Sequence, residues 1–210
     1  MANRFKIPSF LFFCCAVFVC LPGKAAAEEK ARRVGIIFEG SFESPDISKK
    51  PPGGESTLMV PFYEWDYGIR SFSTEEWEKR ELTWDRSFEL SRSLGDQIME
   101  EVEPELIRDD RGVVQYAILA AKEPFLSTAA FSDQFRVKFE ETMGKSLYLV
   151  FIDRYVIYVF PAVGGTLEDY GPALVDEFQS TPLPVSLEVF FLNDDGLRVI
   201  GELSRNATPE

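Results

Sequence analysis

Hydrophobic and polar side chains alternate most regularly in residues 62–72, which we therefore predict to be a half-buried β-strand. One parity holds Tyr63, Trp65, Tyr67 and Ile69, and the other holds Glu64, Asp66 and Arg70. A period of two residues is typical of a strand with one covered face. Pro61 lacks a backbone N–H group and indicates an edge strand or a bulge at the start of this segment.

Residues 33–42 predict an earlier strand. Val34, Ile36 and Phe38 share one parity, and Ile37 interrupts the alternation, so we expect both faces of this strand to be partly covered. Residues 43–56 are rich in proline, glycine, serine and charge without periodicity, which predicts an exposed, flexible loop. Lys49 and Lys50 leave open whether that loop makes a contact with a partner.

A long helix is expected after residue 72. Ser73 and Glu76 have the spacing of a capping box, and small or apolar residues recur at helical spacing on one face. That stripe consists of Trp77, Trp84, Phe88, Ser91, Gly95, Ile98 and Val102. Gly95 either admits another backbone or divides the helix in two, and Pro104 kinks or ends it. Residues 113–121 then favour a strand, with a helix as the alternative.

The second half of the chain predicts a helix followed by a hairpin, twice in succession. The first unit has a helix from Ser127 or Thr128 to Gly144 and a hairpin turning at residues 153–154. The second has a helix capped by Thr166 and a hairpin turning at residues 193–196. Duplication and the chance recurrence of a common topology both explain the pattern. We expect an α+β fold, with an antiparallel sheet carrying its helices on one face.

The first 27 residues have the organisation of a secretory signal peptide. Two basic residues precede an apolar run that is too short to span a membrane, and small residues follow at 25–27. All three cysteines, Cys14, Cys15 and Cys20, fall in this segment. We therefore expect cleavage after Ala27, export to a periplasm or the outside, and no integral membrane segment afterwards. Residues 28–204 should form a single domain, and residues 205–210 a disordered tail.

Composition excludes several kinds of chemistry. The chain has no histidine and a net charge of −13. Removing the signal peptide, with its three basic and no acidic residues, takes this to −16. Serine–histidine and cysteine–histidine catalysis and the usual zinc sites are therefore excluded, and nucleic acid is not an expected partner. The acidic stretch 100–110 lacks the pattern of a calcium loop, so we expect no metal and no cofactor.

Two candidate sites remain, both on the predicted strand 62–72. Tyr63, Trp65 and Tyr67 are either core residues or a contact surface, because flat aromatic rings anchor many interfaces. Glu64 and Asp66 would lie about 7 Å apart on the opposite face, which is within the range of an inverting glycosidase pair. No motif is specific enough to indicate a family.

These observations favour an exported, non-enzymatic binding or accessory protein of the cell envelope or the secreted fraction. Its partner would be a protein or an envelope component of unknown identity. The alternative is a carboxylate-dependent hydrolase, with or without a divalent cation.

Overall fold

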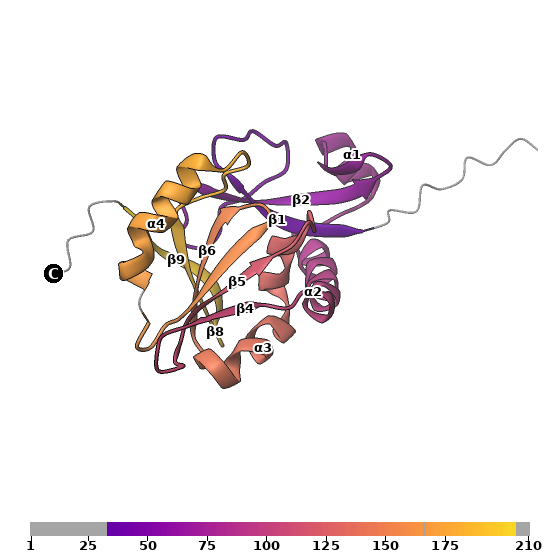
Figure 1. Cartoon of the computed structure of the whole chain (residues 1–210). Coiled ribbons are helices and arrows are strands. Elements are labelled where there is room, and N and C mark those ends of the chain that lie inside the picture. The colour runs from indigo at the N-terminus through magenta and orange to yellow at the C-terminus, as the bar shows by residue number, and fades with distance from the viewer. Residues whose placement is uncertain (1–32, 166, 205–210) are drawn as a thin grey trace, which may run out of the picture. The chain divides into compact units, whose positions relative to one another are not determined.

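The computed structural model describes residues 33–165 and 167–204, so the predicted signal peptide, the Thr166 cap and the predicted tail lie outside the described residues. Two antiparallel sheets and their helices confirm the α+β class (Figure 1). The first sheet has the order β1 (Val34–Gly40), β2 (Thr57–Trp65), β3 (Gly68–Ser71). The second has the order β4 (Glu105–Arg108), β5 (Val114–Ala120), β7 (Val156–Pro161), β6 (Leu147–Asp153), β8 (Glu188–Asn193), β9 (Gly196–Glu202).

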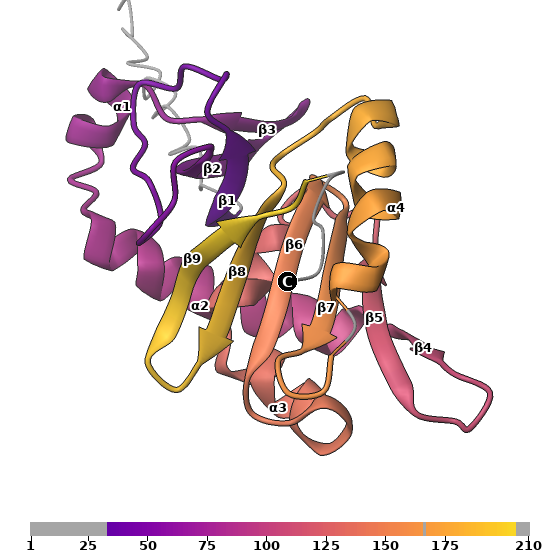
Figure 2. The ribbon, with the colours of Figure 1, turned by 90° about the vertical axis from the view of Figure 1, so that its left-hand side faces the viewer.

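Helices cover both faces of the six-stranded sheet, so the expectation of helices on one face is wrong in this detail. The helical elements are α1 (Thr74–Lys79), α2 (Trp84–Glu101), the 3₁₀ helix η1 (Leu126–Phe131), α3 (Asp133–Met143) and α4 (Leu167–Ser180). Leu149 belongs to the core that contains Phe135 of α3, whereas its neighbour Val150 packs with Leu174 of α4. Successive strand residues point to opposite faces, so α3 and α4 lie on opposite sides (Figures 1 and 2).

The two predicted helix–hairpin units are present as α3–β6–β7 and α4–β8–β9. Their first strands pair with each other, with Leu149 opposite Phe190 and Val150 opposite Val189. In the sequence, however, Leu147-x-Leu149-x-Phe151 parallels Leu187-x-Val189-x-Phe191, so Leu149 corresponds to Val189. These two residues lie on opposite faces of the sheet, so a two-fold axis normal to the sheet does not relate the units.

The predicted long helix is divided, and the break lies before Trp84 rather than at Gly95. The capping box of Ser73 and Glu76 starts α1 as predicted, but Glu81 adopts a φ of 51° and Thr83 caps a new helix. Gly95 lies within the continuous helix α2 and admits the backbone of η1, because an added Cβ would lie 2.9 Å from the carbonyl oxygen of Thr128.

The outer edge of β1 is covered by side-chain hydroxyl groups. The hydroxyl of Ser91 on α2 accepts a hydrogen bond from the backbone N–H of Ile36 at 2.8 Å. On η1, the Ser127 hydroxyl accepts from the backbone N–H of Phe38, and the Thr128 hydroxyl donates to the carbonyl of Ile36. These bonds satisfy polar groups that a buried edge would otherwise leave unpaired. They also dock the small sheet onto α2 and η1.

Residues 43–56, predicted to be an exposed loop, make specific contacts with both sheets. Lys49 forms a bridge with Met59 of β2, and the carbonyl of Pro52 accepts from the backbone N–H of Val199 on β9. The buried carboxylate of Glu188 on β8 accepts from the backbone N–H groups of residues 55 and 56. Pro51 is buried, so this segment joins the two sheets.

Candidate functional site

The structure separates the three aromatic residues of the predicted contact surface. Tyr63 is 2% exposed, and its hydroxyl donates to Glu76 at 2.7 Å, so it belongs to the core. Trp65 is half-buried at the end of β2, and Tyr67 lies in the turn before β3 and is 85% exposed. Of the two alternatives left open for these residues, Tyr63 fits the core, whereas Tyr67 lies in the turn, where the strand no longer buries it.

Trp65 and Tyr67 form a small cluster at the tip of the β2–β3 hairpin, which we call the hairpin tip. Their rings meet edge to face, with centroids 5.0 Å apart. The guanidinium of Arg70 lies 5.2 Å from the Trp65 ring centroid, which is within the range of a cation–π contact. Arg70 also donates to the Tyr63 hydroxyl and to Glu76, and these bonds fix the guanidinium beside the ring.

Glu64 and Asp66 are not brought together on one strand face, because β2 ends at Trp65 and Asp66 lies in the turn. The Glu64 carboxylate accepts two hydrogen bonds from the guanidinium of Arg33, at 3.1 and 3.2 Å. Arg33 also donates to Glu123 at 2.9 Å. Glu64 therefore joins a charge cluster between β2 and the segment before η1, and this pairing differs from that of two catalytic carboxylates facing a common substrate.

Sequence reasoning missed a pocket of about 220 Å³ at the junction of the two sheets. Its charged lining residues are Glu39 of β1, Glu43 of the following loop and Arg154 of the β6–β7 turn. Arg154 donates to the Glu39 carboxylate at 2.5 Å, and Glu39 is only 5% exposed. The guanidinium also lies 5.7 Å from the Phe62 ring centroid, and its Nε finds no hydrogen-bond partner among the described residues.

Burial raises the pKa of Glu39, and the charge of Glu43 adds to the rise, although Arg154 opposes it. The contrast with Glu188 is informative. Burial also acts to raise the pKa of Glu188, but the Thr57 hydroxyl and the backbone N–H groups of residues 55 and 56 outweigh it, so its pKa lies below the ordinary value. An acidic residue within the apolar run 34–40 was the available sequence signal for Glu39, whereas Arg154 is distant in sequence and gave none.

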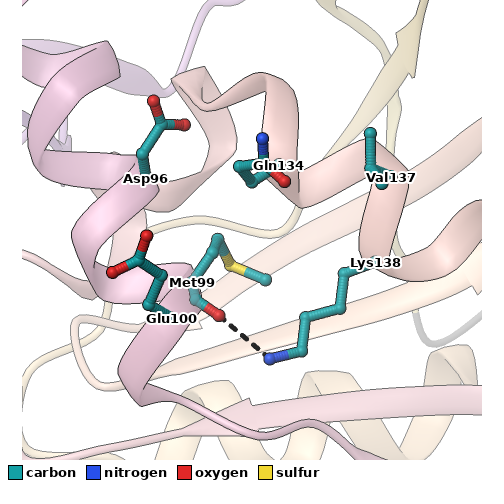
Figure 3. A pocket seen from close by; sticks show the side chains of 6 residues that line it. All are labelled: Asp96, Met99, Glu100, Gln134, Val137 and Lys138. Carbon is teal, nitrogen blue, oxygen red and sulfur yellow. Dashed lines mark hydrogen bonds between the residues drawn. The ribbon is translucent and has the colours of Figure 1, made fainter.

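A second pocket, of about 440 Å³, lies between α2 and α3 (Figure 3). Asp96 and Glu100 of α2 face Gln134 and Lys138 of α3 across it. The Lys138 ammonium donates to the carbonyls of Met99 and Val102 at 2.9 Å each. These carbonyls lie at the end of α2, where backbone acceptors lack helical partners, so Lys138 stabilises the helix end.

In the parts of the chain that the structure describes, no three potential ligands among aspartate, glutamate, cysteine and histidine are grouped as a metal site would require. Over the same residues, no helix combines the length and apolar character needed to cross a bilayer. Comparisons with family models, curated proteins and solved structures found no match.

Proposed function

We propose that this chain is an exported, non-enzymatic binding protein of the cell envelope or the secreted fraction, and that the hairpin tip is its contact surface for a protein partner. The observation that carries the proposal is the 85% exposure of Tyr67 beside Trp65. Tryptophan, tyrosine and arginine are the residue types that contribute most to protein interfaces. Here all three stand together on one short hairpin.

The rigid, hydrogen-bonded geometry of the β2–β3 hairpin supports the proposal. Trp65 pairs with Gly68 in the antiparallel register, so the turn is short and its two arms are tied together. The hydrogen bonds of Arg70 to Tyr63 and Glu76 join the tip to the core and to α1. A cluster held in this way loses little conformational freedom on binding, which favours affinity.

The test is a capture experiment with the full chain, expressed with a C-terminal tag in the cells that make it. After crosslinking, the captured protein is identified by mass spectrometry, and its affinity is measured with purified components. We expect Tyr67→Ala to weaken binding roughly thirtyfold, about 2 kcal/mol. Val163→Ala is the matched control, because Val163 is 86% exposed outside the hairpin. Equal binding by wild type and Tyr67→Ala would exclude the hairpin tip.

A separate experiment tests the proposed export and the cleavage after Ala27. Mass spectrometry of the purified protein should find Glu28 as its first residue, in the envelope or the medium. An intact chain beginning at Met1 in the cytosol would contradict the export part of the proposal and leave the binding part to the capture experiment.

A carboxylate-dependent hydrolase is the second candidate. Its active site would be the pocket that contains Glu39 and Glu43 rather than the predicted pair of Glu64 and Asp66. A buried carboxyl with a raised pKa is typical of a general acid. It ranks second because the ion pair with Arg154 holds Glu39 as an acceptor. The test is hydrolysis of chromogenic esters and glycosides, which Glu39→Gln should abolish if the pocket is catalytic.

A further inference from the structure

A pocket of about 130 Å³ lies between α4 and the six-stranded sheet, away from the hairpin tip. Three tyrosines line it, together with a phenylalanine and one carboxylate. These are Tyr116 of β5, Tyr158 and Phe160 of β7, and Tyr170 and Glu177 of α4. Tyr170 and Glu177 are seven residues apart on the helix, so they lie two turns apart on its sheet-facing side. We call this the tyrosine pocket.

The rings of the tyrosine pocket form walls of different orientation. Tyr116 meets Tyr170 at an interplanar angle of 62°, with centroids 4.6 Å apart. Phe160 stacks on Tyr116 at 5.3 Å, and Tyr158 is tilted by 43° to Tyr116 at 6.2 Å. Aromatic faces carry negative electrostatic potential, and rings of different orientation border this one small volume.

The charged side chain that lines the tyrosine pocket is negative, like the potential of the aromatic faces. Glu177 carries the one carboxylate among the described residues that line the pocket, and none of those residues is basic. Its carboxylate accepts a hydrogen bond from the Tyr158 hydroxyl at 2.5 Å. Burial and this hydrogen bond both raise the pKa of Tyr158. The phenol therefore remains a neutral donor and orients the carboxylate.

We propose that the tyrosine pocket binds a quaternary ammonium group of the choline type, as a free small molecule or as a lipid headgroup. Aromatic faces combined with an anion are the known solution for such cations, which cannot donate an N–H hydrogen bond. The volume of about 130 Å³ is well below the roughly 300 Å³ at which pockets for drug-sized ligands begin. One compact headgroup fits that size.

The first experiment measures the binding of choline and tetramethylammonium to the full chain by calorimetry and tyrosine fluorescence. The control ligand is 3,3-dimethyl-1-butanol, which has the shape of choline without its charge. We expect saturable binding of both cations and at least roughly tenfold weaker binding of the alcohol, since it lacks the cation–π and carboxylate attractions. No saturable binding of choline, or equal binding of the alcohol, would overturn the proposal.

Variants assign the site. Tyr170→Leu removes a ring and should weaken choline binding about threefold to thirtyfold, whereas Tyr170→Phe keeps the ring and should bind like wild type. Glu177→Gln should also weaken binding, because it removes the charge. Circular dichroism checks that each variant is folded. Full affinity in folded Tyr170→Leu would place choline elsewhere and refute the site.

Vesicles distinguish the two sources of the cation. Retention on vesicles of phosphatidylcholine, but not of phosphatidylglycerol, together with choline binding would assign the pocket to a lipid headgroup. Choline binding without vesicle retention would assign it to a free amine. Tyr67→Ala should leave choline affinity unchanged, so failure of the hairpin-tip proposal and failure of this one are separable.

Discussion

The two faces of the six-stranded sheet are built from the same strands but differ in chemistry. The face under α2, η1 and α3 is closed by phenylalanine and aliphatic side chains, and Leu149, Phe151 and Phe190 on it are at most 1% exposed. The face under α4 carries partly buried tyrosines, among them Tyr148 and Tyr158. We call these the closed face and the open face.

The difference shows that, because successive strand residues point to opposite faces, one face of the sheet can form the core while the other presents partly exposed tyrosines. Helical elements and strand β1, whose Phe38 contacts Phe151 and Phe190, bury the closed face, so its residues contribute mainly apolar burial. A single helix covers the open face and leaves tyrosines at its border, where the rings pack and the hydroxyls reach polar groups. The tyrosine pocket lies on the open face, where the partly buried tyrosines can be replaced at a smaller cost to the fold than its fully buried residues, such as Val150 and Phe160.

The strongest test of this comparison replaces one residue on each face of β6. Phe151 contacts the rings of Phe38 and Phe190, with centroids 4.5 and 5.0 Å away. Phe151→Ala should lower the free energy of unfolding by about 3–5 kcal/mol, because it leaves a cavity in a closed core. Tyr148→Ala, on the open face of the same strand, should cost about 1–2 kcal/mol, because the ring is only half-buried. Urea denaturation measures both, and equal losses would contradict the distinction.

Two helical glycines sharpen the comparison. An added Cβ at Gly95 of α2 would lie 2.9 Å from the Thr128 carbonyl oxygen, whereas at Gly171 of α4 the nearest contact is a methyl group of Leu203 at 3.8 Å. Gly95→Ala should cost about 1–3 kcal/mol through overpacking, more than alanine gains in helix propensity.

Gly171→Ala should change stability by less than about 1 kcal/mol. The gain in helix propensity is offset there, because the residue before Pro172 is restricted in a helix. Thermal unfolding measures both glycine variants. A neutral Gly95→Ala would mean that α2 and η1 move apart easily, and the closed face would then be less closely packed than its burial indicates.

Local patterns predicted most of the elements, because capping boxes, turn residues and strand alternation act over a few residues. The hairpin turns at residues 153–154 and 193–196, the cap at Ser73 and the stop at Gly144 follow from such patterns. The turn at residues 66–67 was missed, because the alternation continues across it and predicted a single strand over 62–72. The assignment of α3 and α4 to opposite faces could not be predicted, since both helices are amphipathic and a sheet offers either side. The break near Glu81 was missed because the apolar stripe continues across it.

The candidate sites were less predictable for the same physical reason. The pairing of Glu39 with Arg154 joins residues 115 positions apart, and the tyrosine pocket combines β5, β7 and α4. Neither arrangement leaves a local motif. The hairpin tip was predictable in part, because Trp65 and Tyr67 stand on one short segment, but the burial of Tyr63 depends on its hydrogen bond to Glu76 and on packing against Phe72.

The smallest expected effect concerns the hydroxyl of Tyr158 on the open face. Tyr158→Phe should cost about 1 kcal/mol at pH 8, because it removes one partly exposed hydrogen bond to Glu177. The folded pKa of Tyr158 is raised above the ordinary value of 10.0. The stability that this group contributes is therefore complete below about pH 10 and is lost as the pH rises toward the folded pKa. Urea denaturation between pH 8 and pH 11 should show the gap between wild type and variant narrowing. A stability difference that stays constant with pH would mean that Tyr158 has the same pKa in the folded and unfolded states. It would contradict the assignment of Tyr158 as a neutral donor that orients Glu177.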